Sequence, residues 1–122
     1  MATRVQNSGF DIITNRMSGA GTAPKYVGWG TGSGQAAAAT ALATAAAEAR
    51  TSGTESRTTT TVANDTYKVT GTMTCAGAGK TISEVGLFDA STAGNLFVYS
   101  DFTGVALSIG ESIQFEISVA FA

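Results

Sequence analysis

Residues 112–121 read SIQFEISVAF, and in this run large apolar side chains alternate without a break with polar or small ones. A strict period of two over such a length is typical of a β-strand that buries one face and exposes the other. The large apolar side chains all fall on the same face: Ile113, Phe115, Ile117, Val119 and Phe121. The run therefore predicts a half-buried strand near the end of the chain.

The same period returns in residues 66–75, TYKVTGTMTC, which follow a β-branched run over 58–62 and predict a hairpin with it. Shorter strand patterns occupy residues 25–30, 81–88 and 96–102, next to Gly, Pro or Asn. One face of the 66–75 strand collects residues that we expect in the core: Tyr67, Val69, Gly71, Met73 and Cys75.

Short strands at this regular spacing predict an all-β protein, an antiparallel β-sandwich or barrel with a jelly roll as one subtype, and of these we favour the sandwich. The chain has 122 residues, which is enough for one domain. We divide it into an N-terminal region over residues 1–53, with a short helix or arm, a strand and an Ala-rich segment, and a strand core over residues 54–122.

The first residues predict a short helix. Ser8 is placed to cap its first turn, and Phe10, Ile13 and Met17 recur at helical spacing. Gly19 marks the end of the pattern, because glycine is the residue that most often stops a helix. Two turns of helix before the first long strand are therefore expected.

Residues 35–50 contain ten Ala and one large apolar side chain, that of Leu42. Ala has the highest helix propensity, but this stretch has little apolar surface to bury against the rest of the protein. Two interpretations stay open: a helix in the second half of the segment, or an extended arm that lies on another surface.

Small side chains dominate the composition, since Ala, Thr, Gly and Ser fill 66 of the 122 positions. A core built from so few large residues must be thin, and it would gain stability from contacts with neighbouring subunits. The net charge of −2, with only seven basic residues, argues against nucleic acid as a partner. No apolar run is long enough for a membrane span or for a signal peptide.

Catalytic chemistry has few candidates. The chain has no His, and the single Cys75 cannot form an internal disulfide or a thiolate metal cage. Glu84 shares a strand face with apolar residues, so it is either one of a pair of acid–base carboxylates or an acceptor of backbone N–H groups from a nearby turn. We favour the second interpretation and expect no catalytic residue, no metal and no cofactor.

A set of short runs spans most of the chain: GFD at 9–11, NRMSG at 15–19, PKYVGWGTG at 24–32, TISEVGLFDA at 81–90, GNLF at 94–97 and GESI at 110–113. This set resembles small structural proteins of tailed bacteriophages. The run EVGLFD is also similar to parts of phage tail-fibre and tail-collar proteins. The resemblance implies a virion component, foremost a capsid cement or decoration protein with a β-sandwich body that forms trimers on the outer shell.

We therefore expect a non-enzymatic virion protein, made in the host cytoplasm without a signal peptide, that binds the outer capsid surface. Its partners would be the major capsid protein, whose subunits it bridges, and itself, as a homotrimer, with no nucleic acid and no membrane. We place the contacts in the N-terminal helix and the Ala-rich segment, with Trp29 as an anchor. The candidate interface residues are Phe10, Ile12, Ile13, Arg16, Trp29, Leu42 and Arg50.

The alternative is a tail-associated or receptor-binding phage protein that recognises host surface glycan. Aromatic faces with polar edges suit sugars. Four residues have this character: Tyr26, Trp29, Tyr67 and Tyr99. Packing of two or three of these residues inside the core is the interpretation that we favour.

Overall fold

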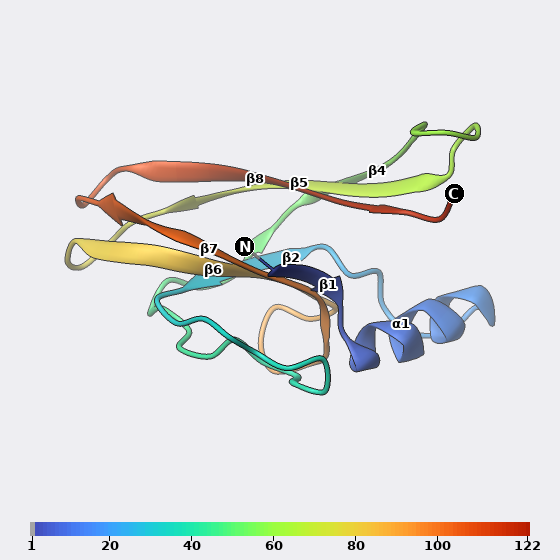
Figure 1. Ribbon diagram of the computed structural model, residues 1–122, viewed down its shortest axis with the longest axis horizontal. Coiled ribbons are helices and arrows are strands. Elements are labelled where there is room, and N and C mark those ends of the chain that lie inside the picture. The colour runs from blue at the N-terminus through green and yellow to red at the C-terminus, as the bar shows by residue number, and fades with distance from the viewer. Residues whose placement is uncertain (1) are drawn as a thin grey trace.

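The chain folds into two facing β-sheets with one helix beside them, as Figure 1 shows for the computed structural model, which describes residues 2–122. The elements follow in this order: β1 (Ala2–Val5), α1 (Asn7–Met17), β2 (Tyr26–Gly30), β3 (Thr51–Ser52), β4 (Thr54–Thr58), β5 (Thr66–Thr74), β6 (Lys80–Phe88), β7 (Leu96–Leu107) and β8 (Ser112–Ala120). The prediction of an all-β protein with a short N-terminal helix is confirmed.

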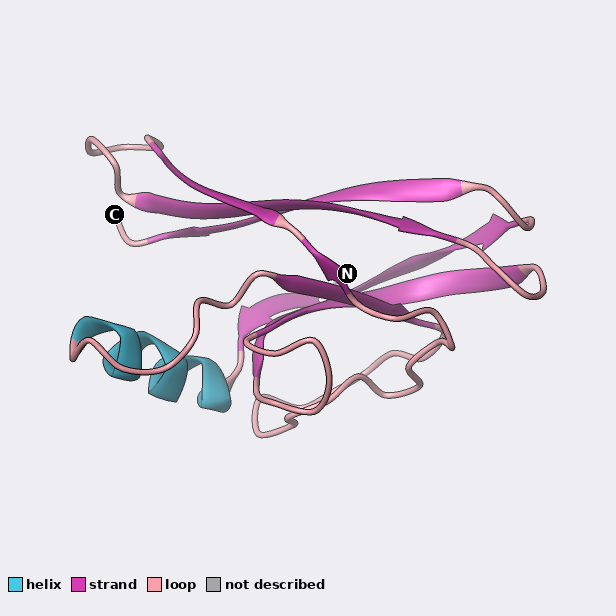
Figure 2. Ribbon diagram, turned by 180° about the vertical axis from the view of Figure 1, so that it is seen from behind, coloured by secondary structure: helices cyan, strands magenta, loops and turns pink. Residues whose placement is uncertain are grey.

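One sheet has the strand order β1-β7-β6-β2-β3, and the other has the order β4-β5-β8. Every neighbouring pair is antiparallel. The sheets lie face to face in both views, so the predicted antiparallel sandwich is confirmed (Figures 1 and 2). Along the chain, β6 and β7 lie between β5 and β8; β6 pairs with β7 in one sheet, and β5 pairs with β8 in the other. This nesting is a feature of jelly rolls, but here it extends over two strand pairs only.

The chain crosses between the sheets at Gly53, which separates β3 from β4. The Gly53 N–H donates to the carbonyl oxygen of Lys25 at 2.7 Å. A Cβ at this position would lie 2.5 Å from Cγ1 of Val69 and 2.9 Å from the carbonyl oxygen of Thr70. Only glycine fits so close an approach. The crossing closes one side of the sandwich, and β1 and β8 are the edge strands of the opposite side.

The core lies between the sheets and uses the predicted faces of β5 and β8. Trp29 is 1 % exposed, and its ring meets that of Phe115 edge to face with the centroids 6.4 Å apart. The inward face of β5 is the predicted one: Tyr67, Val69, Gly71, Met73 and Cys75. The inward side chains of β8 remain half-buried, and Phe121 lies beyond the strand, 63 % exposed.

A second apolar cluster lies on the other face of the five-stranded sheet. Phe88, Leu96 and Tyr99 are buried there against Tyr26 and Leu42. Parts of β6 and β7 are therefore buried on both faces, which explains why their sequences contain continuous apolar runs rather than strict alternation.

The Ala-rich segment, residues 35–50, forms no helix but follows an irregular path of turns and bends along that outer face, and we call it the arm (Figure 1). The prediction of a helix in its second half is wrong. The alternative of an arm that lies on another surface is correct, except that the arm bends and turns instead of being extended. The arm lies against its own chain: Ala45 forms an isolated bridge with Gly30, and the Thr31 N–H donates to the carbonyl oxygen of Thr44 at 2.9 Å. An Ala run without an apolar stripe gains more from such contacts than from an isolated helix.

Helix α1 turns a different face to the sheet from the one predicted. Gly9 and Ile12 are buried, whereas Phe10 and Met17 are 57 % and 82 % exposed. Ser8 lies inside the first turn, where its hydroxyl donates to a carbonyl oxygen of β7 at 2.6 Å, so the predicted cap is wrong. The helix is placed by close backbone packing at Gly9 together with the buried side chain of Ile12, which belongs to the core.

Single residues define two turns. Gly19, with φ +84°, ends α1 as predicted. In the loop after β4, the carboxylate of Asp65 accepts the N–H groups of Thr60, Thr61 and Val62 at 2.8–2.9 Å. The predicted hairpin is confirmed, but most of the β-branched run is this loop, and the first strand of the hairpin lies further upstream.

Candidate interaction surfaces

Glu84 of β6 is fully buried and holds the arm on the sheet. Its Oε2 accepts the N–H groups of Gly32 at 3.2 Å and Thr44 at 2.8 Å, and its Oε1 accepts the N–H of Ala43 at 3.0 Å and the hydroxyl of Tyr99 at 2.8 Å. Burial and the hydrogen bond to Glu84 raise the pKa of Tyr99, so the phenol keeps its proton and continues to donate.

Four donors occupy the acceptor sites of the Glu84 carboxylate. The interpretation of Glu84 as an acceptor of backbone N–H groups is therefore confirmed. The arm reaches the carboxylate because a side chain is missing at two positions. A Cβ at Gly32 would lie 2.7 Å from that of Ala43, and one at Gly30 would collide with the Thr44 carbonyl oxygen and with Glu84 itself.

Glu48 is a second carboxylate that joins the arm to the core, and its side chain is 9 % exposed. Its Oε1 accepts the indole N–H of Trp29 at 2.9 Å, and its Oε2 accepts the N–H of Ala76 at 2.9 Å and forms an ion pair with Lys80. Burial alone would raise the pKa of Glu48, but the Lys80 ammonium and the N–H donors outweigh it and hold the pKa at about 2. Glu48 is therefore ionised at neutral pH.

Arg50 closes the far end of the arm. Its guanidinium lies over the ring of Phe88, 3.4 Å from the centroid, and its Nη1 donates to the carbonyl oxygens of Ala90 and Ala93 at 2.9 and 2.7 Å. Burial lowers the pKa of Arg50, and the nearby Asp89 carboxylate opposes that change. Arg50 is a predicted interface residue, but its guanidinium already binds two carbonyl oxygens and the Phe88 ring of its own chain.

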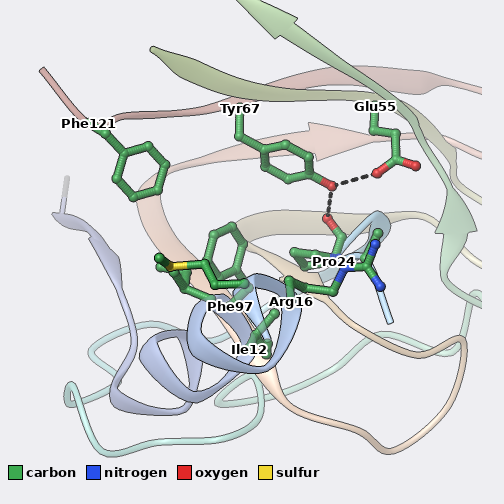
Figure 3. Close-up of a pocket in the computed structure, with 10 residues that line it drawn as sticks. Ile12, Arg16, Pro24, Glu55, Tyr67, Phe97 and Phe121 are labelled. Atoms are coloured by element: carbon green, nitrogen blue, oxygen red, sulfur yellow. Dashed lines mark hydrogen bonds between the residues drawn. The ribbon is translucent and has the colours of Figure 1, made fainter. Parts of the chain in front are cut away.

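A groove of about 280 Å³ lies between α1 and the three-stranded sheet (Figure 3). Most of its lining is apolar, and the figure shows Ile12 and Phe97 below it, with Tyr67 above and Phe121 to one side. Three of the predicted interface residues line it together: Ile12, Ile13 and Arg16. Sequence reasoning missed the partners that complete it, because they come from the segment before β2, from β4, β5 and β7, and from the end of the chain.

The polar part of this groove centres on Tyr67. Its hydroxyl lies 2.8 Å from the carbonyl oxygen of Pro24 and 3.0 Å from Oε2 of Glu55, so it donates its one proton to either of two acceptors (Figure 3). Burial together with the hydrogen bond and charge of Glu55 raises the pKa of Tyr67, and the Arg16 charge opposes this. The groove thus combines an apolar floor with one neutral phenol and two opposite charges.

The other predicted site residues are not brought together. Phe10 lies exposed outside the groove, and Trp29 is buried in the core, so it is not presented at the surface of the chain as an anchor. Leu42 is half-buried in the cluster under the arm. Trp29 and Tyr99 are both buried, so the four aromatic residues form no common platform for a sugar, and the preferred interpretation of core packing holds for these two.

Within residues 2–122, no cluster of His, Cys, Asp or Glu side chains is arranged to hold a metal ion. The same part of the chain contains no helix that is both long and apolar enough to cross a membrane. The carboxylates of Glu84 and Glu48 bind the protein's own backbone, and the surface offers an apolar groove. These features define the class of the protein: a β-sandwich whose buried charges are structural.

Comparison with known families then identifies the family. The model of the family described as podophage GP4 fiber I protein gp80 matches residues 1–119, and the chain belongs to this family. It is therefore a structural protein of a phage, of the tail-fibre type. No curated protein and no solved structure matches the chain. The resemblance to phage structural proteins is thus confirmed at the level of a tail-fibre-like virion protein.

Proposed function

We propose that this protein is a non-catalytic structural subunit of a phage tail fibre and that it acts through protein–protein contacts. The observation that carries the proposal is the match of a fibre-protein family over residues 1–119. The arrangement of Glu84 and Glu48 supports a non-catalytic role, because their oxygens hold the arm in place.

The groove beside α1 is the surface that we assign to a partner subunit. Its apolar lining and few polar groups suit an apolar protein side chain better than a sugar, which would need several hydrogen-bonding groups in register. Arg16 and Glu55 on the same groove provide opposite charges, which can pair with polar groups of the partner around that side chain and so fix its register. For a protein in the tail, a protein partner is therefore better supported than a glycan on the host surface.

The second candidate is attachment to the outer capsid surface, with the protein bridging major capsid protein subunits as a homotrimer. One observation favours it: the arm spreads small side chains over an outer face, and small side chains let the backbone of a partner approach closely. Both candidates describe a virion protein without catalytic activity. They differ in where the protein sits on the particle.

Immunogold electron microscopy of purified virions distinguishes the candidates. Gold confined to the tail is the expected result. Gold spread over the shell would replace the tail assignment by the capsid assignment, and particles without gold, in a preparation where the antibody detects the released protein, would contradict both.

The groove is tested by incorporation of variants into particles. Ile13→Arg places a charge in the groove and should reduce incorporation at least tenfold, whereas Phe10→Arg, on the exposed face of the same helix, should leave it unchanged. Equal incorporation of the two variants would assign the partner contact to another surface.

A further inference from the structure

Strand β8 is an unprotected sheet edge, unlike the other edges of the sandwich. β1 has four residues, β3 has two, and β4 carries the charges of Glu55 and Arg57. Short length and charge are devices that keep sheet edges from pairing with other chains. β8 has nine residues, pairs with β5 in unbroken register, contains no Pro and carries one charge, that of Glu116.

The free backbone groups of β8 follow from hydrogen bonds at both ends of its ladder with β5. The Phe121 N–H donates to the carbonyl oxygen of Asp65, and the Cys75 N–H donates to that of Glu111. Because hydrogen bonding alternates along an antiparallel strand, the odd-numbered residues of β8 bond to β5 and the even-numbered ones point outward. The outward N–H and C=O groups belong to Ser112, Gln114, Glu116, Ser118 and Ala120.

An apolar opening of about 490 Å³ lies beside this edge, between β7 and β8. Its lining includes Phe102, Val105, Phe115 and Ile117, and Val105 is 42 % exposed. The inward side chains of β8 are only half-buried for this reason. The sandwich is thus closed at the Gly53 crossing and incompletely covered on the side of β8.

We propose that a second copy of this chain covers the β8 edge and the apolar opening beside it. The charge pattern favours a copy over a charged partner. Glu116 lies 3.1 Å from Lys68 on the neighbouring strand, so the edge presents no uncompensated charge that would attract a partner of opposite sign. An antiparallel β8–β8 pair would satisfy the outward N–H and C=O groups of both copies through one twofold operation.

The size of the surface agrees with self-association. A strand of nine residues extends for about 30 Å, and two sheets about 10 Å apart present a side about 20 Å wide with their outer side chains. The two copies together would bury about 1,200 Å² of surface, which is the lower end of the range for stable protein–protein interfaces. Strand pairing and filling of the opening are both needed to reach it.

This inference goes beyond the proposed function and does not depend on where the protein sits on the virion. Sedimentation equilibrium of the purified full chain at several concentrations tests it directly. The wild-type chain should form an oligomer of the 12.3 kDa subunit. Ser118→Pro removes one outward N–H without removing a bond to β5, so it should weaken association at least tenfold while circular dichroism stays that of a folded β protein.

Arg57→Pro is the matched control, because the same parity places the Arg57 N–H on the outward edge of β4. It should leave association unchanged. Ser118→Lys provides a second disruption that does not depend on accommodating a proline ring. A wild-type chain that is monomeric throughout would overturn the proposal, and so would an oligomer that survives Ser118→Lys.

Discussion

Glu84 forms more hydrogen bonds between separate segments than the other carboxylates described above, because its one carboxylate binds two backbone segments and the hydroxyl of Tyr99. The arm donates through Ala43 and Thr44, and the loop after β2 donates through Gly32. None of these segments has regular secondary structure to satisfy its N–H groups. The carboxylate therefore replaces a strand partner for this part of the chain.

Replacing this carboxylate tests its role. In Glu84→Gln, the amide NH₂ would face N–H donors, and a buried donor left without an acceptor is costly. We expect the free energy of unfolding to fall by about 2–4 kcal/mol, measured by urea denaturation. Glu116→Gln, which removes the charge of an exposed ion pair, should change it by less than about 0.5 kcal/mol. Equal losses in the two variants would contradict the assignment.

Glu48 predicts a dependence of stability on pH. Its pKa is about 2 in the folded chain and 4.5 without the fold, so the unfolded chain binds more protons between these values. The stabilising contribution of Glu48 is complete above pH 4.5 and is lost as the pH falls toward 2. Urea denaturation across this range should show a shallower acid loss for Glu48→Gln than for wild type. Parallel curves would mean that Glu48 is not held ionised by Lys80 and its N–H donors.

The sequence supported Glu84 as a structural acceptor but placed Trp29 and Arg50 at an interface. A carboxylate on an apolar strand face must find donors, so its environment follows from local pattern. The partner of Trp29 is Glu48, and that of Arg50 is the turn after β6. These partners lie on other segments, and only tertiary packing brings them together.

At the scale of elements, the arm depends on a close approach to β2. Gly30→Ala would place a methyl group against the Thr44 carbonyl oxygen and the Glu84 carboxylate, so the arm must move away from the sheet. Thermolysin should then cleave near Leu42 at least tenfold faster than in wild type. Ser33→Ala, at an exposed position of the same loop, is the control and should cleave at the wild-type rate. An unchanged rate in Gly30→Ala would show that the arm is held elsewhere.

The strands could be predicted and the arm could not, for a physical reason. A half-buried strand can be recognised from the sequence alone, because its large apolar side chains alternate with polar or small ones, as they do in residues 66–75 and 112–121. The arm over residues 35–50 has neither alternation nor an apolar stripe, and its conformation is imposed by the sheet beneath it. The prediction of helix α1 is correct in its location but not in its buried face, because the contact is made by Gly9 and Ile12 rather than by Phe10 and Met17.

On the scale of the whole molecule, a thin core is completed in two different ways. On the outer face of the five-stranded sheet, the chain covers its own apolar residues, because Leu42 of the arm packs against Phe88 and Tyr99. Along β8, the described chain leaves an apolar opening and a row of outward backbone groups. Covering this side by a second copy would make folding stability and assembly parts of one equilibrium.

Coupling of this kind makes thermal stability depend on protein concentration. A monomer unfolds at the same Tm at every concentration, whereas an oligomer that dissociates on unfolding becomes more stable as concentration rises. For a dimer of two 122-residue chains, a tenfold increase should raise Tm by about 3 °C. Calorimetry over two decades of concentration should show this slope for wild type and Arg57→Pro. Ser118→Lys should show none, because its β8 edge no longer pairs, and a wild-type Tm without any slope would refute the coupling.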